Sequence, residues 1–96
     1  MTVYVDDMRM RKRLGQRPAK WSHLFADSVE ELHEFAERIG LKRIWFQDSP
    51  TEPHYDVTET RRLAAIAAGA TPVNWPTFAR ERIRERQRSQ GLHRQA

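Results

Sequence analysis

The sequence predicts an α/β fold in which three helices cover a small three-stranded parallel sheet, in the order βαβαβα. Three short apolar segments, at residues 3–5, 41–46 and 71–75, are each followed by a stretch with helical features. Strands joined through a helix pair in parallel by right-handed crossovers. The chain of 96 residues, with 39% hydrophobic residues, has enough apolar material for one modest core.

The first half of the chain is predicted to form a strand, a loop and a helix. Residues 3–5, Val-Tyr-Val, are typical of a short buried strand that stops at Asp6 and Asp7. Residues 8–27 are basic, lack a sustained period and contain Gly and Pro, so we expect a long loop. The helix is predicted over residues 28–39, because Ser28 and Glu31 fit a capping box and Gly40 fits a left-handed C-terminal cap.

The second half repeats the alternation. Residues 41–46 are predicted to form the second strand, which the prolines that follow would end. Thr58 is the expected N-cap of a second helix, with an apolar stripe that ends before Gly69 and comprises Leu63, Ala64, Ile66 and Ala67. Residues 71–75 give a third strand, and Pro76 suits the first turn of a last helix through about Arg88, before a frayed tail.

The predicted spatial order of the strands is 2-1-3. Residues 3–5 form the most apolar strand and are placed in the centre, whereas Lys42, Arg43 and Pro72 favour edges for the other two. Residues 1–79 are expected to form the single domain, and residues 80–96 an Arg-rich helix end and tail. The two short edges would allow a homodimer.

Composition excludes several classes of site. The chain has no Cys, which excludes disulfides, thiolate zinc sites and cysteine nucleophiles. It lacks a phosphate-binding glycine loop, G-x-G-x-x-G, G-x-S-x-G and H-E-x-x-H, and no motif predicts an organic cofactor. No apolar run is long enough for a membrane span and the first residues do not resemble a signal peptide, so a cytoplasmic protein without a membrane partner is expected.

Charge is distributed unevenly along the chain. Two basic flanks, residues 1–20 and 76–96, each carry a net charge of +4, counting six Lys/Arg against two Asp/Glu. Residues 21–75 carry five against nine, a net charge of −4. Such flanks can attract nucleic acid or an acidic protein, but they can equally be ordinary solvated surfaces.

Candidate functional residues gather at one predicted edge of the sheet. Sites in open parallel sheets form beyond the carboxyl ends of the strands. Asp6 and Asp7 leave the first strand there and are predicted metal ligands, with Asp6 favoured because neighbouring residues point to opposite faces. The predicted catalytic groups, for proton transfer, are His23, His54 and Asp56. The predicted contacts to substrate or phosphate are Arg9, Arg11, Arg13 and Tyr55.

The predicted cofactor is a divalent metal. Carboxylates alone suit Mg²⁺ or Mn²⁺, while added imidazoles favour Mn²⁺ or Zn²⁺. Each residue also has a structural interpretation: the aspartates can cap backbone, His23 and His54 can be packed loop residues, and the tryptophans can be core anchors. His33, inside the first predicted helix, is assigned no functional role.

Several motifs resemble those of a family of small bacterial and phage proteins that is described as a domain of unknown function. The resemblance covers residues 2–79 and is carried by Val3-Tyr4-Val5-Asp6-Asp7, Trp21-Ser22-His23-Leu24, Glu31-Leu32-His33, Phe35-Ala36, Trp45-Phe46-Gln47, Pro53-His54-Tyr55-Asp56-Val57 and Ala68-Gly69-Ala70. It implies a bacterial or bacteriophage protein and no particular activity. Its polar motif positions are Asp6, Asp7, His23, His54, Tyr55 and Asp56.

The leading hypothesis is a metal-dependent hydrolase that acts on a phosphate-containing substrate or nucleic acid. The alternative is a non-enzymatic module that binds nucleic acid or an acidic protein through the basic loop and tail. A third interpretation is a homodimeric interaction protein in which the polar edge is only a hydrogen-bonded cap.

Overall fold

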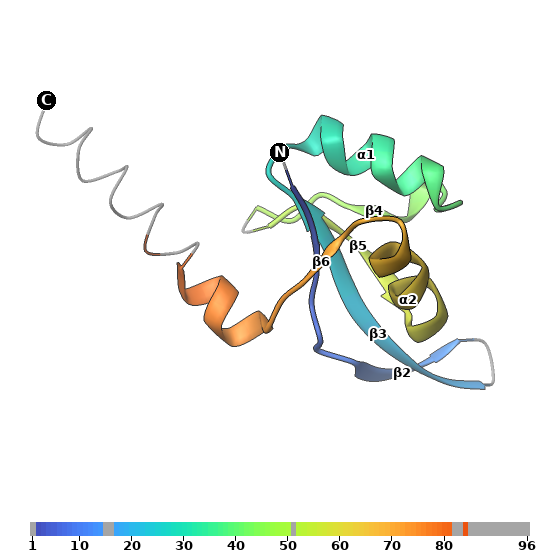
Figure 1. Ribbon diagram of the computed structural model, residues 1–96. Helices are drawn as coiled ribbons and strands as arrows, with labels where there is room; N and C mark the ends of the chain where they lie inside the picture. The colour runs from blue at the N-terminus through green and yellow to red at the C-terminus, as the bar shows by residue number, and fades with distance from the viewer. Residues whose placement is uncertain (1, 15–16, 51, 82–83, 85–96) are drawn as a thin grey trace, which may run out of the picture.

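The computed structural model describes residues 2–14, 17–50, 52–81 and 84, without the side chains of residues 12–14 and 17. It has a mixed α/β architecture, as the sequence predicts (Figure 1). In chain order the elements are β1 Val3–Val5, β2 Met10–Leu14, β3 Arg17–Ala26, α1 Val29–Arg38, the 3-10 turn η1 Arg43–Trp45, β4 Phe46–Gln47, β5 His54–Thr58, α2 Glu59–Ala67 and β6 Thr71–Pro72. Residues 75–81 form a further helical segment.

The sheet differs from the predicted three-stranded parallel one. Its order is β4-β5-β3-β1-β6, with β2 also paired to β3, and β1–β6 is its parallel pair while the other pairs are antiparallel. The predicted pairing of residues 3–5 with 71–75 is therefore correct. The predicted pairing of residues 3–5 with 41–46 is wrong, because β3 and β5 lie between β1 and β4.

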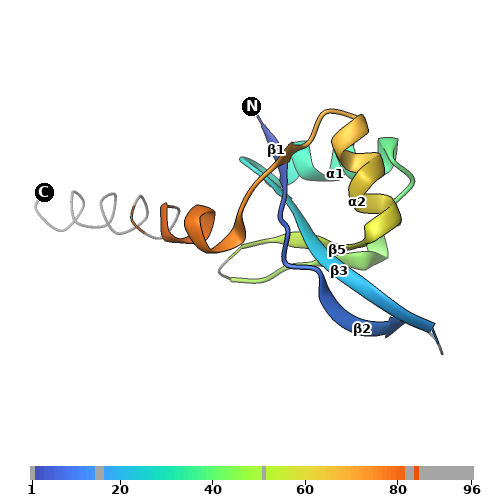
Figure 2. The same cartoon turned by 60° about the horizontal axis from the view of Figure 1, so that its bottom comes forward.

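The long loop predicted over residues 8–27 is also wrong, because this segment forms the hairpin β2–β3. β3 is the longest strand of the sheet: one edge pairs with β1 near its end and with β2 near its start, and the other edge pairs with β5 (Figure 2). Its apolar residues do not alternate with polar ones, since both Leu24 and Phe25 are buried, on opposite faces. A strand covered on both faces has no simple period of two, which is why the pattern was missed.

The strand predicted over residues 41–46 is reduced to Phe46–Gln47. α1 ends in a Schellman motif, in which Gly40 (φ +83°) donates to Glu37 and Leu41 donates to Ala36. Leu41 is thereby buried as part of the helix end, and η1 turns the chain before β4 begins. The helix itself was predicted correctly, including the Ser28 hydroxyl that accepts from the Glu31 N–H at 3.2 Å.

α2 begins and ends as predicted, but its buried face is different. The Thr58 hydroxyl caps the helix, and Gly69 (φ +112°) ends it. The buried residues are Arg62 and Ala65, while Leu63 is 56% exposed. Of the predicted apolar stripe, Ile66 packs partly buried against the core, and the other three residues are exposed. Arg62 is buried in their place and donates from Nε to the Asp6 carbonyl at 2.8 Å.

The two faces of the sheet carry different layers, as Figures 1 and 2 show. On what we call the helix face, α1 and α2 pack over one core that includes Val5, Leu24, Tyr55 and Val57. On the opposite face, here the site face, the helical segment 75–81 packs part of the sheet through Trp75 and Phe78, whose rings contact Phe25. The helix from Pro76 is confirmed at its start; its predicted end and the tail lie outside the described residues.

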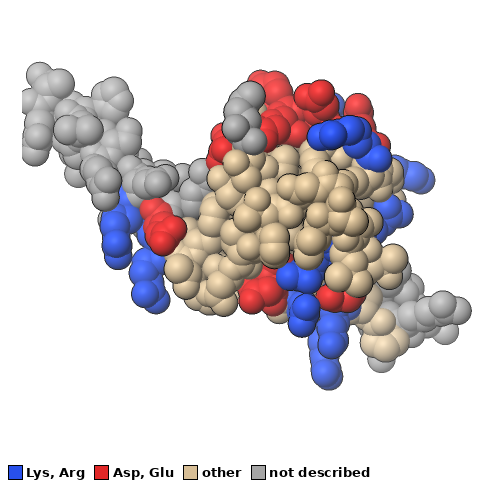
Figure 3. All heavy atoms as spheres, in the orientation of Figure 1, with Lys and Arg blue, Asp and Glu red and all other residues tan. Residues whose placement is uncertain are grey.

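Acidic side chains gather on one part of the surface, with basic side chains beside them. Figure 3 shows acidic groups gathered over α1, which carries Glu30, Glu31, Glu34 and Glu37, and basic groups toward the end that carries β2. The acidic cluster thus lies over the helix face, away from the site face. Among the described residues, no helix combines the length and apolarity that crossing a membrane requires.

Candidate metal centre

Two histidines and two aspartates meet on the site face, on three adjacent strands. Pairing places His23 of β3 opposite Asp56 of β5, and His54 lies two residues before Asp56 on the same face. Asp6 follows β1, and its N–H donates to the carbonyl of His23 at 3.0 Å. The structure therefore brings Asp6, His23, His54 and Asp56 together, four residues that the sequence predicts as functional.

Three of these side chains could hold a metal ion. One ligand atom each from His23, His54 and Asp56 lies within 4.8 Å of the others. Asp56 Oδ1 is 3.9 Å from His23 Nε2 and 3.4 Å from His54 Nε2, and the two imidazoles meet edge to face at 4.9 Å. All three residues are half-buried, so the group is accessible but held within the fold.

Both imidazoles are oriented from behind by acceptors at Nδ1. His23 Nδ1 lies 2.6 Å from Asp6 Oδ2, and His54 Nδ1 lies 2.8 Å from the carbonyl oxygen of Glu52. A carboxylate and a carbonyl accept hydrogen bonds, so the neutral form of each ring carries its proton on Nδ1. The lone pair is then on Nε2, the nitrogen nearest Asp56, as in metal sites whose histidines are held by carboxylates or carbonyls.

Asp6 is fully buried and contacts the three candidate ligands through His23. Its Oδ1 accepts from the backbone N–H of His23 at 2.9 Å and of Met8 at 3.2 Å, and Oδ2 faces the His23 ring. Arg62 also holds Asp6 in place, because it donates to the Asp6 backbone carbonyl. Asp6 therefore positions His23, and Arg62 positions Asp6.

Asp7 points away from this group, as expected for neighbours on an extended chain. Its carboxylate accepts from the backbone N–H of Trp75 at 3.2 Å and lies 3.5 Å from the Asn74 amide. Both contacts fix the start of the helical segment 75–81, where a negative charge also suits the helix dipole. Asp7 thus places Trp75, whose ring lies 5.6 Å from that of His23.

Of the four predicted substrate contacts, the three whose side chains the structure describes do not join the group. Tyr55 lies on the helix face, 1% exposed, and its hydroxyl is 2.7 Å from His33 Nδ1. Arg9 pairs with Glu59 at 3.4 Å, Arg11 is exposed, and the side chain of Arg13 lies outside the described residues.

Hollows lie on both sides of the candidate ligands. One, of about 190 Å³, is lined by His23, Phe25, Ser49, Glu52, His54 and Trp75. Another, of about 390 Å³, is lined by Trp21, Trp45, Gln47, Asp56, Thr58 and Arg61. The candidate ligands therefore face open space on two sides, which leaves room for water or a substrate.

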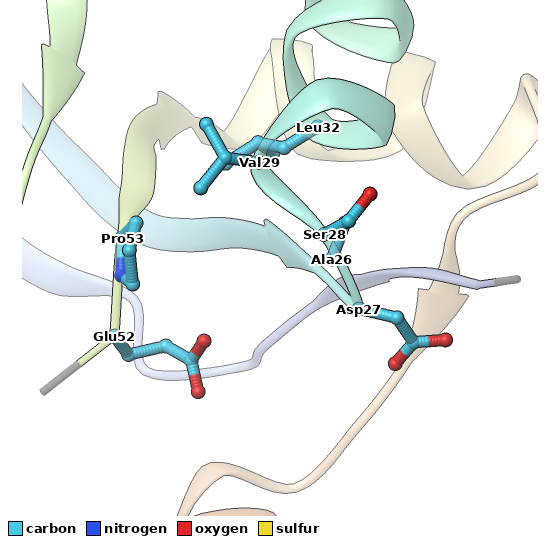
Figure 4. Close-up of a pocket in the computed structure, with 7 residues that line it drawn as sticks. All are labelled: Ala26, Asp27, Ser28, Val29, Leu32, Glu52 and Pro53. Carbon is cyan, nitrogen blue, oxygen red and sulfur yellow. The ribbon is translucent and has the colours of Figure 1, made fainter.

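A third hollow, of about 310 Å³, lies at the start of α1 and contains none of the candidate ligands (Figure 4). Its two carboxylates come from Asp27 and Glu52. Asp27 is engaged in a structural role, because it accepts from the Thr2 N–H and the Tyr4 hydroxyl, both at 3.0 Å. Glu52 links this hollow to the candidate centre, since it also lines the hollow that holds His54.

Sequence reasoning missed three contributors to the centre: Arg62, Trp75 as a neighbour of His23, and the Glu52 carbonyl. Arg62 could have been noticed, because a helix whose small residues face the sheet leaves room for a long side chain. The Glu52 carbonyl has no sequence signal, since every residue carries a backbone acceptor.

The family model described as "Protein of unknown function (DUF4031)" matches residues 3–89. The chain belongs to this family. The DUF4031 match includes every residue of the candidate centre and extends past residue 79, where the resemblance expected from the sequence ends. Neither the curated proteins nor the solved structures that were compared with the chain include a match.

Proposed function

We propose that this DUF4031 chain binds one divalent metal ion through His23 Nε2, His54 Nε2 and the Asp56 carboxylate, and that it is a metal-dependent hydrolase of phosphate esters. The observation that carries the proposal is the convergence of these three ligand atoms with both imidazoles held at Nδ1. A chance meeting of surface groups does not require a fully buried carboxylate behind one of the histidines.

The ligand chemistry favours Zn²⁺ or Mn²⁺ over Mg²⁺. Two imidazole nitrogens and one carboxylate suit borderline metals, whereas Mg²⁺ prefers oxygen ligands and keeps its waters. Three protein ligands leave further positions open, which is the arrangement of catalytic and not of structural metal sites. In this proposal His23, His54 and Asp56 are ligands and Asp6 is a positioning residue, which replaces the proton-transfer and ligand roles that the sequence predicted for them.

The reaction proposed is hydrolysis of a phosphate ester. A bound divalent ion lowers the pKa of a water and polarises a phosphoryl oxygen. The water oxygen would form a bond to phosphorus and the bond from phosphorus to the leaving oxygen would break. The proton that the water gives up would be taken up by the leaving oxygen. Phosphate is favoured as the reacting group because Arg61 lines the hollow that Asp56 also lines.

The test is calorimetric titration of Zn²⁺ and Mn²⁺ into chelator-treated protein, for the parent, His54→Ala and Asp56→Asn. His33→Gln is the matched control, because it removes an imidazole from the other face. We expect saturable binding at one ion per chain for parent and control, and at least about 100-fold weaker binding for the other two variants. Equal binding by parent and His54→Ala, or no binding by the parent, overturns the metal centre.

Hydrolysis is tested separately, on a chromogenic phosphate diester with and without the bound ion. We expect product to form only in the metal-loaded parent. Metal binding without hydrolysis of any phosphate ester would leave a metal-binding protein and overturn the hydrolase. Absence of both would favour the binding module that the basic segments suggest.

A further inference from the structure

The hollow of about 390 Å³ beside Asp56 has the walls of a ligand pocket. Its size falls within the range of about 300–1,000 Å³ of small-molecule sites. Two indoles line it, from Trp21 and Trp45, together with one guanidinium, from Arg61. These groups come from separate parts of the chain, since Trp21 lies on β3, Trp45 ends η1 and Arg61 lies in α2.

The indoles offer planar apolar surface to an occupant, although the cations of Arg61 and Lys42 lie over the Trp45 ring and cover part of it. Trp45 is 38% exposed, although a large aromatic side chain gains most free energy when it is covered. Trp21 lies opposite Thr58 in the β3–β5 pairing, so its indole is held at the sheet side of the same hollow. Exposed aromatic rings that line a hollow are the usual stacking platforms for nucleic-acid bases.

Two cations accompany the indoles without a carboxylate partner. The Arg61 guanidinium lies 5.3 Å and the Lys42 ammonium 5.6 Å from the Trp45 ring centre. Among the described residues neither cation forms an ion pair; the Arg61 guanidinium donates from Nη1 to the Gly40 carbonyl, at 3.4 Å. An anionic group on the occupant would neutralise them, and the guanidinium fork matches phosphate best.

We propose that this hollow binds a nucleotide unit, with its base against Trp21 and Trp45 and its phosphate at Arg61 and Lys42. The Gln47 amide and the Thr58 hydroxyl at its wall supply donors and acceptors for the edge of a base. Because Asp56 lines this hollow and belongs to the candidate metal centre, the nucleotide is also the substrate class of that centre. Only this last step rests on the proposed function, since the base and phosphate contacts need no metal.

The experiment is calorimetry on the full chain in the presence of a chelator, with adenosine 5′-monophosphate, adenosine and ribose 5-phosphate as probes. We expect the nucleotide to bind at least about tenfold more tightly than either fragment, because stacking and charge each contribute. Trp45→Ala should weaken nucleotide binding about tenfold or more. Arg61→Gln should reduce nucleotide affinity toward that of adenosine, with Lys42 keeping part of the phosphate contact, and leave adenosine binding unchanged.

The matched control is Arg38→Gln, which removes a guanidinium on α1 that lies over the Phe35 ring and lines neither hollow beside the candidate ligands. It should bind the nucleotide as the parent does, and circular dichroism should confirm that each variant is folded. A 5′-phosphorylated tetranucleotide tested alongside shows whether the natural ligand is a free nucleotide or the end of a nucleic-acid strand. Tighter binding than the mononucleotide indicates a strand end, and equal or weaker binding indicates a free nucleotide.

Three outcomes overturn the nucleotide pocket: ribose 5-phosphate binding as tightly as the nucleotide, binding unaffected by Trp45→Ala, or no saturable binding of mononucleotide and tetranucleotide. Failure of the metal centre is seen independently, in the metal titration. Nucleotide binding without metal binding would overturn the proposed function alone, and metal binding without nucleotide binding would overturn this pocket alone.

Discussion

The two faces of β5 use the same strand for opposite purposes. Tyr55 and Val57 point into the core beneath α1 and α2 and are at most 1% exposed. His54 and Asp56 point to the site face and remain half-buried beside His23. The alternation of a single strand therefore separates core packing from candidate chemistry by one residue.

Each face also carries a histidine with a hydrogen-bonding partner, and the partners differ in kind. On the helix face, His33 faces the neutral hydroxyl of Tyr55 at 2.7 Å. Burial, with help from the charge of Arg43, lowers the pKa of His33, and burial also raises the pKa of Tyr55. Both groups are thereby kept uncharged, as a packed layer requires.

On the site face, carboxylates take the place of the hydroxyl. Asp6 lies behind His23, and Asp56 lies in front of both His23 and His54. Two carboxylates around two imidazoles form a site that suits a cation. The surroundings of His33 and Tyr55 instead favour the uncharged form of both groups. The difference shows which histidines are candidate ligands: those held by acceptors at Nδ1 with a carboxylate at Nε2.

The largest expected effect separates stability from metal binding. Leu24→Ala, in the core of the helix face, should lower the free energy of unfolding by about 2–5 kcal/mol and leave the metal ligands in place. His54→Ala should lower it by only about 1 kcal/mol, because it loses one half-buried hydrogen bond, and should abolish metal binding. Urea unfolding and metal titration of both variants measure the two effects. If His54→Ala proves as destabilising as Leu24→Ala, the site face is part of the structural core and the comparison fails.

The next effect tests the carboxylate behind His23. Asn in place of Asp6 can still accept from the backbone N–H groups of His23 and Met8, but its amide would donate to His23 Nδ1. The ring proton would then move to Nε2, the proposed ligand atom. We expect Asp6→Asn to weaken metal binding about 10–100-fold, measured by calorimetry, and to shift the tautomer of His23, measured by nitrogen NMR.

Asp7→Asn is the control for this variant, because it changes an adjacent carboxylate that contacts Trp75 and Asn74 and not the imidazoles. It should retain the affinity of the parent for the metal. Equal losses in both variants would mean that charge near the site matters and the orientation of His23 does not.

The parts of the fold that follow local rules could be predicted from the sequence. Ser28 and Thr58 cap their helices, and Gly40 and Gly69 end them with positive φ, because each of these roles depends on one residue and its near neighbours. The pairing of β3 with β5 depends on contacts between distant segments. The charge of residues 8–20 hid the strand, since a basic edge hairpin and a basic loop have the same composition.

The convergence of the candidate residues was predicted more closely than the topology that brings them together. Asp6, Asp7, His23, His54 and Asp56 were expected to converge at the carboxyl edge of a parallel sheet. All of them except Asp7 converge, and they do so across antiparallel strands. The residue types were sufficient to predict this convergence. Carboxylates and imidazoles next to buried strands need polar partners, because burying them without one costs free energy. Tyr55 was predicted as a substrate contact but lies on the helix face. The face to which a strand residue points depends on the strand's register, and residues 54–58 were not assigned to a strand.

The smallest expected effect concerns pH and the histidine of the helix face. The unfolded chain takes up a proton on His33 near the ordinary value of 6.5, whereas the folded protein does so only at lower pH. Between these two pKa values the unfolded state binds more protons, so this contribution to stability is complete above pH 6.5 and is lost as the pH falls. When the pH falls from about 7.5 to about 5, we expect His33→Gln to lose less free energy of unfolding than the parent, as measured by urea unfolding. Titrating groups that do not interact with His33, which excludes Glu30 and Glu37, contribute equally to both proteins and cancel in the difference. A steeper loss in His33→Gln would show that His33 is stabilised as a cation, and the contrast between an uncharged pair on the helix face and a cation site on the site face would then be wrong.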